Sequence, residues 1–315
     1  MMRFKSLVLI VILAISCNLF DKDDHFIRNP NLELLITHRE QGRSAFFPIL
    51  SKDGRWIYFI LGWRQFTNYI AGDLYKHEIE TQKEILVING EPLYGIGYID
   101  LSPDGNYIVA TNGPAFPAHP FFSWGGELLL LIDTSGIIID TLDTLEPLVA
   151  DPRFNWDGTK IYFYGFGGEN PGIYRINPDG TGEEYVAPPP SPGYWGSYPS
   201  YEILENDSVI TFSPMTFPRL NRQRPEWVVV TKYFGSGLVA PASPLILINT
   251  EEGDTIILDD KPYPGSLARY FPYWTPGGGS IIFSVAPHYG VPSGYGIFDI
   301  WVLKNVFEQT GGGKK

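Results

Sequence analysis

The chain has 315 residues, enough for one large domain or two ordinary ones, and its 44% hydrophobic and 18% charged residues are typical of a folded globular protein. The 34 Gly and 27 Pro residues favour tight turns, and the 19 Tyr, 20 Phe and 8 Trp favour strands, so the composition predicts an all-β fold. A formal net charge of −12 excludes proteins that bind nucleic acid through a basic surface.

The N-terminus has the organisation of a secretory signal peptide. Arg3 and Lys5 precede an apolar run from Leu7 to Ile15, which is shorter than the roughly 20 residues that a membrane-spanning helix needs. The sequence that follows, Ala14-Ile15-Ser16-Cys17, resembles the bacterial lipoprotein box, although Ala stands where Leu is commonest. In that family the cysteine is acylated and becomes the mature N-terminus, which makes Cys17 the expected lipidation site.

Cys17 is the only cysteine of the chain, which excludes disulfides and cysteine-bound metals within it. We therefore expect an exported protein that is anchored by lipid in the bacterial outer membrane. Residues 22–24, Lys-Asp-Asp, resemble the export signal of surface lipoproteins, but a short charged tether would read the same. The periplasmic side of that membrane and the cell surface both stay open.

Five copies of one pattern follow along the chain. Each copy has a short strand, a turn rich in Asp, Asn and Gly, and a second apolar strand, as two-residue hairpin turns require. The copies span residues 46–59, 97–110, 151–163, 197–212 and 270–283. The isoleucines of their second strands, Ile57, Ile108, Ile161, Ile210 and Ile281, are 51, 53, 49 and 71 residues apart. A repeat of this length with several strands per unit indicates a β-propeller.

Each copy continues into a third strand, and the first four into a fourth. The third strands are expected at 73–79, 128–133, 172–177, 245–249 and 298–304, and the fourth at 84–88, 137–142, 183–187 and 255–259. The strand missing from the fifth copy is present at the other end of the chain, at 32–38. We predict that this N-terminal strand completes the last blade and closes a ring of five four-stranded antiparallel blades. The 71-residue spacing leaves room for a degenerate sixth.

The turn Ser102-Pro103-Asp104-Gly105, with prolines upstream in other copies, resembles the WD40-like repeat of the TolB β-propeller family. The turn departs from that pattern in the copies at 197–212 and 270–283. The resemblance implies a periplasmic or surface propeller that binds other molecules; it does not by itself imply an enzyme. The expected organisation is a signal peptide (1–16), a lipidated tether (17–30), a propeller (31–308) and a flexible Gly/Lys tail (309–315).

Catalytic motifs are lacking in the sequence. No serine lies in a G-x-S-x-G elbow, and the histidines His25, His38, His77, His119 and His288 form no metal-binding pair, so we expect neither a metal nor a cofactor. The alternative to a binding protein is an enzyme, most plausibly a glycoside hydrolase, which needs two carboxylates about 5–10 Å apart in the central funnel. Asp100 and Asp151, near the starts of innermost strands, are the candidates.

The loops predict where a ligand binds. The connections within hairpins are short, whereas those at 112–127, 187–201, 212–244, 259–274 and 286–296 are long, and strand alternation places all the long ones on one face. They carry aromatic residues, which suit a binding surface or pack inward as a satellite core. These residues are Phe116, Phe121, Phe122, Trp124, Tyr194, Trp195, Phe217, Tyr233, Phe234, Tyr270, Tyr289 and Tyr295.

Arg219, Arg222 and Arg224 form a basic cluster in the longest of these loops, either as a solvated tip or as a contact for an acidic ligand group. Together these features predict a monomeric, non-catalytic binding module whose partner is an envelope protein or a glycan. Aromatic residues stack on sugars and also serve as protein hot spots, so composition does not choose between the two.

Overall fold

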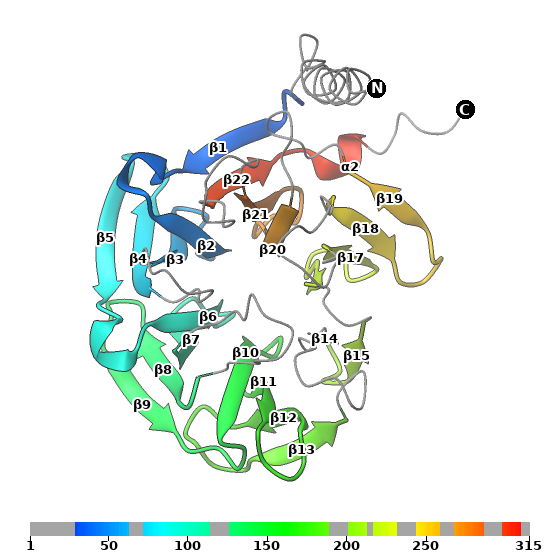
Figure 1. Ribbon diagram of the computed structural model, residues 1–315. Helices are drawn as coiled ribbons and strands as arrows, with labels where there is room; N and C mark the ends of the chain where they lie inside the picture. Colours follow the sequence, from blue (N-terminus) through cyan, green and yellow to red (C-terminus); the bar gives the residue numbers. More distant parts are fainter. Residues whose placement is uncertain are drawn as a thin grey trace, which may run out of the picture.

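The computed structural model describes residues 29–62, 72–113, 126–188, 201–212, 217–231, 244–258, 268–286 and 298–309. In this part of the chain the sheets follow one another around a central axis, as the blades of a β-propeller (Figure 1). Every strand pair is antiparallel, and the hydrophobic residues of neighbouring sheets form clusters between them. The all-β propeller predicted from the sequence is confirmed.

Six blades lie within the described residues, and five of them have four strands. Blade 1 contains β2 (Ser44–Leu50), β3 (Trp56–Gly62), β4 (Gly72–Glu78) and β5 (Lys83–Ile88). Blade 2 contains β6 (Ile96–Leu101), β7 (Tyr107–Asn112), β8 (Leu129–Asp133) and β9 (Ile138–Leu142). Blade 3 contains β10 (Leu148–Phe154), β11 (Ile161–Phe166), β12 (Gly172–Ile176) and β13 (Glu184–Ala187). A single residue pair, Gly72 of β4 with Ile96 of β6, connects blades 1 and 2 into one continuous sheet.

The second half of the chain contains the other three blades. Blade 4 has two strands among the described residues, β14 (Tyr201–Ile203) and β15 (Val209–Thr211). Blade 5 contains β16 (Arg219–Leu220), β17 (Trp227–Val230), β18 (Ile246–Asn249) and β19 (Thr255–Ile257). Blade 6 contains β20 (Ala268–Trp274), β21 (Ile281–Ala286), β22 (Asp299–Leu303) and β1 (Leu32–Ile36).

The ring is closed by its N-terminal strand, as predicted. Strand β1 pairs with β22 from Leu32 opposite Leu303 to Ile36 opposite Ile300, so residues from the two ends of the chain share one blade (Figure 1). Leu32 and Ile36 are buried, whereas Leu34 between them is exposed. The strand thus adds apolar contacts as well as the hydrogen bonds that an open edge would lack.

The count of five blades is corrected by the 71-residue gap, which contains an additional hairpin. Strands 245–249 and 255–259, which the sequence assigned to the fourth repeat, belong instead to blade 5 with β16 and β17. The turn of this hairpin, 221–226, has no Asp-Gly or Gly-Gly pair. Its Asn221 accepts hydrogen bonds through Oδ1 from the backbone N–H groups of Gln223 (3.0 Å) and Arg224 (3.2 Å). The side chain of Asn221 therefore stabilises this turn, whereas the turns of other repeats contain Asp-Gly or Gly-Gly pairs.

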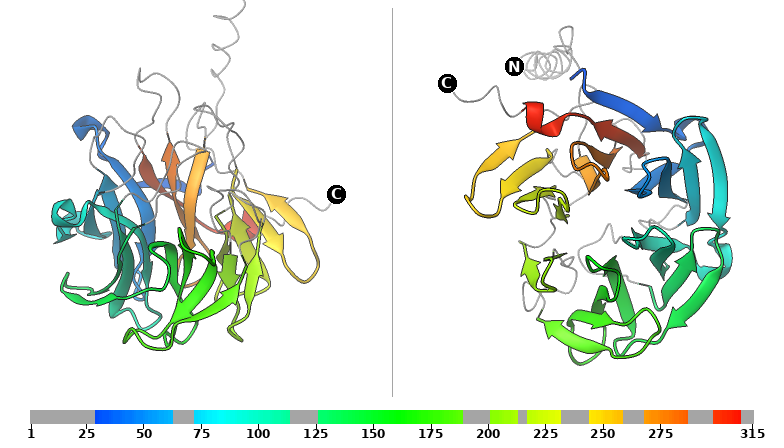
Figure 2. Two further views of the ribbon diagram at one scale, coloured as in Figure 1. Left: turned by 60° about the horizontal axis from the view of Figure 1, so that its bottom comes forward. Right: turned by 180° about the vertical axis from the view of Figure 1, so that it is seen from behind.

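The two faces of the ring differ in their connections. The inner two strands of every blade are joined by turns of five or six residues, at 51–55, 102–106, 155–160, 204–208, 221–226 and 275–280. We call the face with these turns the short-turn face. Because the strands are antiparallel, the connections between second and third strands start and end on the opposite, long-loop face. Figure 2 shows the ring tilted relative to the view of Figure 1 and from behind.

The chain after β22 forms a short helix, α2 (Val306–Gln309), that the sequence did not predict. Val306 is buried, and the Phe307 side chain stacks on Trp274 with ring centroids 5.8 Å apart. The chain after β22 is therefore packed on the propeller at Val306 and Phe307. Among the described residues, no helix has the length and apolar character needed to cross a membrane.

Candidate ligand-binding site

The six inner hairpins give equivalent positions around the axis. The first residue of each turn donates its backbone N–H across the hairpin at 2.7–3.0 Å, and these residues are Ser51, Ser102, Asn155, Leu204, Asn221 and Thr275. Two residues before them lie Ile49, Asp100, Arg153, Glu202, Arg219 and Tyr273, which we call the charged layer. Four residues before them lie Phe47, Tyr98, Asp151, Phe217 and Phe271, which we call the aromatic layer; the blade 4 member is outside the described residues.

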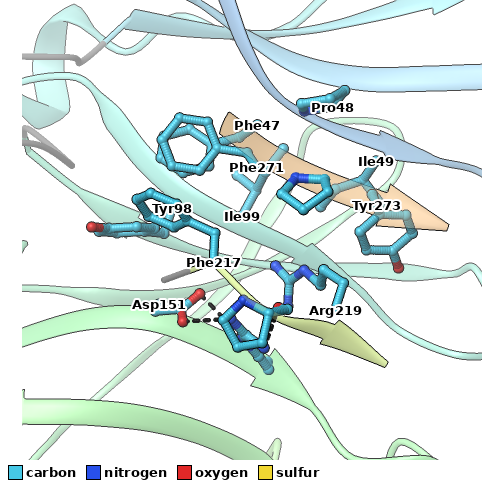
Figure 3. A pocket seen from close by; sticks show the side chains of 13 residues that line it. Phe47, Pro48, Ile49, Tyr98, Ile99, Asp151, Phe217, Arg219, Phe271 and Tyr273 are labelled. Carbon is cyan, nitrogen blue, oxygen red and sulfur yellow. Dashed lines mark hydrogen bonds and ion pairs between the residues drawn. The ribbon is translucent and has the colours of Figure 1, made fainter. Parts of the chain in front are cut away.

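These layers enclose a pocket on the axis, the axial pocket (Figure 3). All five members of the aromatic layer line it, together with Ile49, Arg153, Arg219 and Tyr273 of the charged layer. Its volume is about 380 Å³ and includes the part open to solvent. Inner strands start at the long-loop face, so the aromatic layer is the one closer to that face. The aromatic layer nevertheless lies at the middle of the inner strands, as Phe47 does in β2, and the charged layer lies nearer the short-turn face.

A backbone irregularity aims the aromatic layer at the axis. Phe47, Asp151 and Phe271 have positive φ angles of 53°, 48° and 53°, and each precedes a proline. In all three strands two residues oppose one on the neighbouring strand, which is a β-bulge. A left-handed backbone costs about 1–3 kcal/mol for a residue other than glycine, and such strain concentrates at functional sites. The upstream prolines noted in the repeats thus mark the bulges that line the pocket.

Four aromatic side chains form one continuous wall. The ring centroids of Phe47 and Phe271 are 3.8 Å apart, those of Phe47 and Tyr98 5.0 Å, and those of Phe217 and Phe271 4.9 Å. These rings come from blades 2, 1, 6 and 5, so the wall covers a large part of the circumference. Asp151 of blade 3 faces them from across the pocket (Figure 3).

Arg153 is the centre of a buried ion-pair network. Its guanidinium binds both oxygens of Asp151 (3.2 and 2.7 Å) and also contacts the carboxylate of Glu202. It donates further to the backbone oxygens of Tyr201 (2.7 Å) and Pro218 (3.3 Å). These contacts join blades 3, 4 and 5 near the axis. Because the Arg153 guanidinium already has protein acceptors, it does not need a ligand to accept its hydrogen bonds.

Arg219 is placed differently, although it has the same position in its blade. Its guanidinium lies 3.9 Å from the Glu202 carboxylate and 5.5 Å from the ring centre of Tyr273. Within the described part of the chain, its side chain makes no hydrogen bond, and it is 18% exposed. Figure 3 shows this side chain among the pocket-lining residues.

The carboxylates of the charged layer are strongly affected by burial. Burial raises the pKa of the Asp100 carboxyl, an effect that the guanidinium groups of Arg219 and Arg222 oppose. Burial likewise raises the pKa of Glu202, against the attraction of Arg153 and Arg219. Asp100 Oδ2 accepts a hydrogen bond from the Phe154 backbone N–H at 2.9 Å. Of the two candidate carboxylates, Asp151 is bound to Arg153 and lines the pocket. Asp100 is buried and does not line the pocket.

The structure separates the three arginines that the sequence placed in one long loop, because that segment contains β16, β17 and the turn between them. Arg219 belongs to the pocket, whereas Arg222 and Arg224 lie in the short turn on the opposite face. Arg222 donates to the Phe154 backbone oxygen at 3.0 Å and so ties blade 5 to blade 3. The Arg224 guanidinium lies 4.1 Å from the ring centre of Phe307 in α2. The expected basic cluster on the long-loop face is therefore wrong.

Most of the predicted aromatic residues and the lipidation site lie outside the described residues. They are Cys17, Phe116, Phe121, Phe122, Trp124, Tyr194, Trp195, Tyr233, Phe234, Tyr289 and Tyr295. Phe217 is described and lines the pocket. Tyr270 lies in β20, not in a loop, and packs on Phe217, Phe271 and Phe298 at centroid distances of 6.0, 5.8 and 5.5 Å. It therefore belongs to the core and not to the pocket lining.

Sequence reasoning missed Phe47, Tyr98, Arg153, Phe271 and Tyr273 as pocket residues. The signal was present in the repeats, since these residues stand two or four positions before the hairpin turn. Residues that alternate along an innermost strand of a ring lie at the axis, so alignment of the copies would have found them.

Two of the histidines that looked scattered in the sequence converge on one carboxylate. Glu84 Oε1 lies 3.1 Å from His38 Nε2 and 3.3 Å from His77 Nδ1. In the part of the chain that the structure describes, no group of three or more His, Cys, Asp or Glu side chains is arranged to hold a metal ion.

The sequence matches no protein-family model and no curated protein. Among solved structures, an oligogalacturonate lyase from Vibrio parahaemolyticus aligns with 83% of this chain and 77% of its own at 13% identity and a TM-score of 0.49. TolB from Acinetobacter baumannii aligns at 14% identity and a TM-score of 0.41; 86% of this chain matches 56% of that protein. Both are β-propeller proteins. At these identities the matches concern the fold and carry no argument about a ligand.

Proposed function

We propose that this protein is a non-catalytic, TolB-like binding module of the bacterial cell envelope, anchored by lipid at Cys17, whose partner binds on the long-loop face over the axial pocket. The observation that carries the proposal is the pocket itself, where five blades contribute side chains at equivalent positions. Strained backbone at Phe47, Asp151 and Phe271 supports it, because such strain concentrates at functional sites.

The contacts of the two candidate carboxylates favour binding over glycoside hydrolysis. A general acid and its partner need access to the substrate and freedom to exchange protons. Asp151 is held on both oxygens by Arg153, and Asp100 is buried against the Phe154 amide. Both therefore stabilise the inner strands and are poorly placed to act on a sugar.

The test is a binding comparison between the two faces. We expect Trp124→Ala, Trp195→Ala, Tyr289→Ala and Phe217→Ala to weaken capture of the partner in a pull-down, by about 2 kcal/mol or more for a hot spot. Controls on the short-turn face, at Lys52, Asn106 and Glu251, should bind as the wild type does. If only the controls lost binding, the site would lie on the short-turn face and the proposal would be wrong.

The anchor is tested separately. We expect the wild-type protein to sediment with membranes and Cys17→Ala to be released or left unprocessed. Wild-type protein found wholly in the soluble fraction would contradict the anchor while leaving the binding proposal intact.

A further inference from the structure

We propose that the axial pocket binds a carboxylate carried on an apolar body, such as the last residue of a peptide chain or a small aryl or alkyl acid, and that Arg219 recognises its charge. This inference rests on the proposed binding function and names the chemical class of the ligand.

The first step is the difference between two arginines of one layer. The guanidinium of Arg153 has protein acceptors for its N–H groups: Asp151, Glu202 and two backbone oxygens. The guanidinium of Arg219 has an ion pair with Glu202 at 3.9 Å, the ring of Tyr273 and the charge of Asp100 near it, but its side chain makes no hydrogen bond in the described part of the chain. The Arg219 guanidinium thus has N–H groups with no acceptor among the described residues, and a carboxylate can accept two such groups at once.

The second step is the chemistry of the walls. Eight of the thirteen lining residues have no polar side-chain atom; these are Phe47, Pro48, Ile49, Ile99, Phe217, Pro218, Phe271 and Pro272. A sugar would bring several hydroxyl groups that these walls leave without partners, which weakens binding. An apolar chain or aromatic ring instead fits against the rings of Phe47, Phe217 and Phe271. The walls therefore favour an apolar acid over a sugar acid.

The third step is the direction of approach. Arg219 lies deeper than the aromatic layer because its position is closer to the turn at 221–226. An acid that enters from the long-loop face would pass its charged end between the rings to the guanidinium.

The experiment is calorimetric titration of the full chain with N-acetyl-L-phenylalanine, its primary amide and galacturonate. We expect the acid to bind at least about tenfold more tightly than the amide, since a charge-assisted hydrogen bond of this kind contributes about 1.5–3 kcal/mol. Arg219→Gln should remove this preference and Arg219→Lys should keep part of it. Arg175→Gln, which breaks an exposed ion pair with Glu184, is the matched control and should bind as the wild type does.

Each other outcome overturns a defined part of the proposal. If the wild type bound the acid and the amide equally, Arg219 would not recognise the carboxylate, although the pocket would still be a binding site. This comparison needs no variant. Tighter binding of galacturonate would show that the pocket takes a hydroxyl-rich acid. If none of the probes binds, the carboxylate proposal fails, and the proposed function then depends on the pull-down alone. To separate peptide ends from free acids, peptides ending in Phe are compared with the same peptides amidated.

Discussion

At the scale of single residues, Glu84 joins the strand that closes the ring to the first blade. Burial acts to raise the pKa of its carboxyl, but hydrogen bonds from His38 and His77 prevail and lower it from 4.5 to about 2. The hydrogen bond that His38 donates to Glu84 raises the pKa of His38 above 6.5, against burial and the charge of Arg43. Protonation of this group of side chains is thus coupled to folding.

The directions of these shifts predict how stability depends on pH. The lowered pKa of Glu84 contributes stability above pH 4.5, and this contribution is lost as the pH falls toward about 2. The raised pKa of His38 contributes stability below pH 6.5, and that contribution is lost as the pH rises through the folded-state value. We expect Glu84→Gln to lower the free energy of unfolding by about 1–3 kcal/mol near pH 5–6 and to flatten both flanks.

Thermal melts between pH 3 and 9 measure this effect. Glu33→Gln is the matched control, because it removes an exposed ion pair with Lys304 and should change the melting temperature little. Parallel pH profiles for the wild type and Glu84→Gln would contradict the coupling.

Arg153 gives a second prediction at this scale. We expect Arg153→Gln to lower the free energy of unfolding by about 3–5 kcal/mol, because Asp151 and Glu202 would remain buried without their partner. Glu33→Gln should cost less than about 1 kcal/mol, since its ion pair with Lys304 is exposed. Urea denaturation of the two variants measures the difference. A loss for Arg153→Gln as small as that of the control would show that the axial network does not stabilise the ring.

At the scale of elements, the hairpin of β16 and β17 depends on one side chain. Asn221 is fully buried, its Oδ1 accepts the two turn N–H groups, and its Nδ2 donates to the Gly278 backbone oxygen at 2.8 Å in blade 6. We expect Asn221→Ala to cost about 2–3 kcal/mol, because buried backbone groups of two blades lose their partners. Asn206→Ala, in the exposed turn of blade 4, should cost about 1 kcal/mol or less. Denaturation in urea tests both, and equal losses would contradict the role assigned to Asn221.

The same hairpin shows why the elements were only partly predictable. Strand patterns and Asp-Gly turns gave the hairpins of blades 1 to 3 and the closing strand, since these depend on local sequence. The hairpin at 219–230 was missed because β16 has only two residues and its turn contains charged side chains that read as a loop. The pocket was missed for another reason: it is built from residues that only the closed ring brings together, such as Phe47 and Phe271.

At the scale of the whole molecule, closure unites the two ends of the chain and thereby completes the axial pocket. Phe271 comes from blade 6 and Phe47 from blade 1, on either side of the junction that β1 makes. Blade 4 is the thinnest part of the ring, with two strands in the described residues, and the ties made there by Arg153 and Arg222 join its neighbours directly. The integrity of the site is therefore a property of the closed ring.

Deletion of residues 29–40 tests this dependence. The deletion removes β1, exposes the edge of β22 and uncovers the core that Leu32 and Ile36 bury. We expect aggregation or a fall of several kcal/mol in the free energy of unfolding, because an open edge pairs with other chains. Two variants serve as controls: deletion of Gly311 to Lys315, which follows α2, and Leu34→Asp, which places a charge on the exposed side of β1. Both should melt close to the wild type.

In hydrogen exchange, the amides of β21 and β22 should lose protection first in the deletion variant. If the deletion and its controls melt alike and keep this protection, β1 does not hold the ring closed.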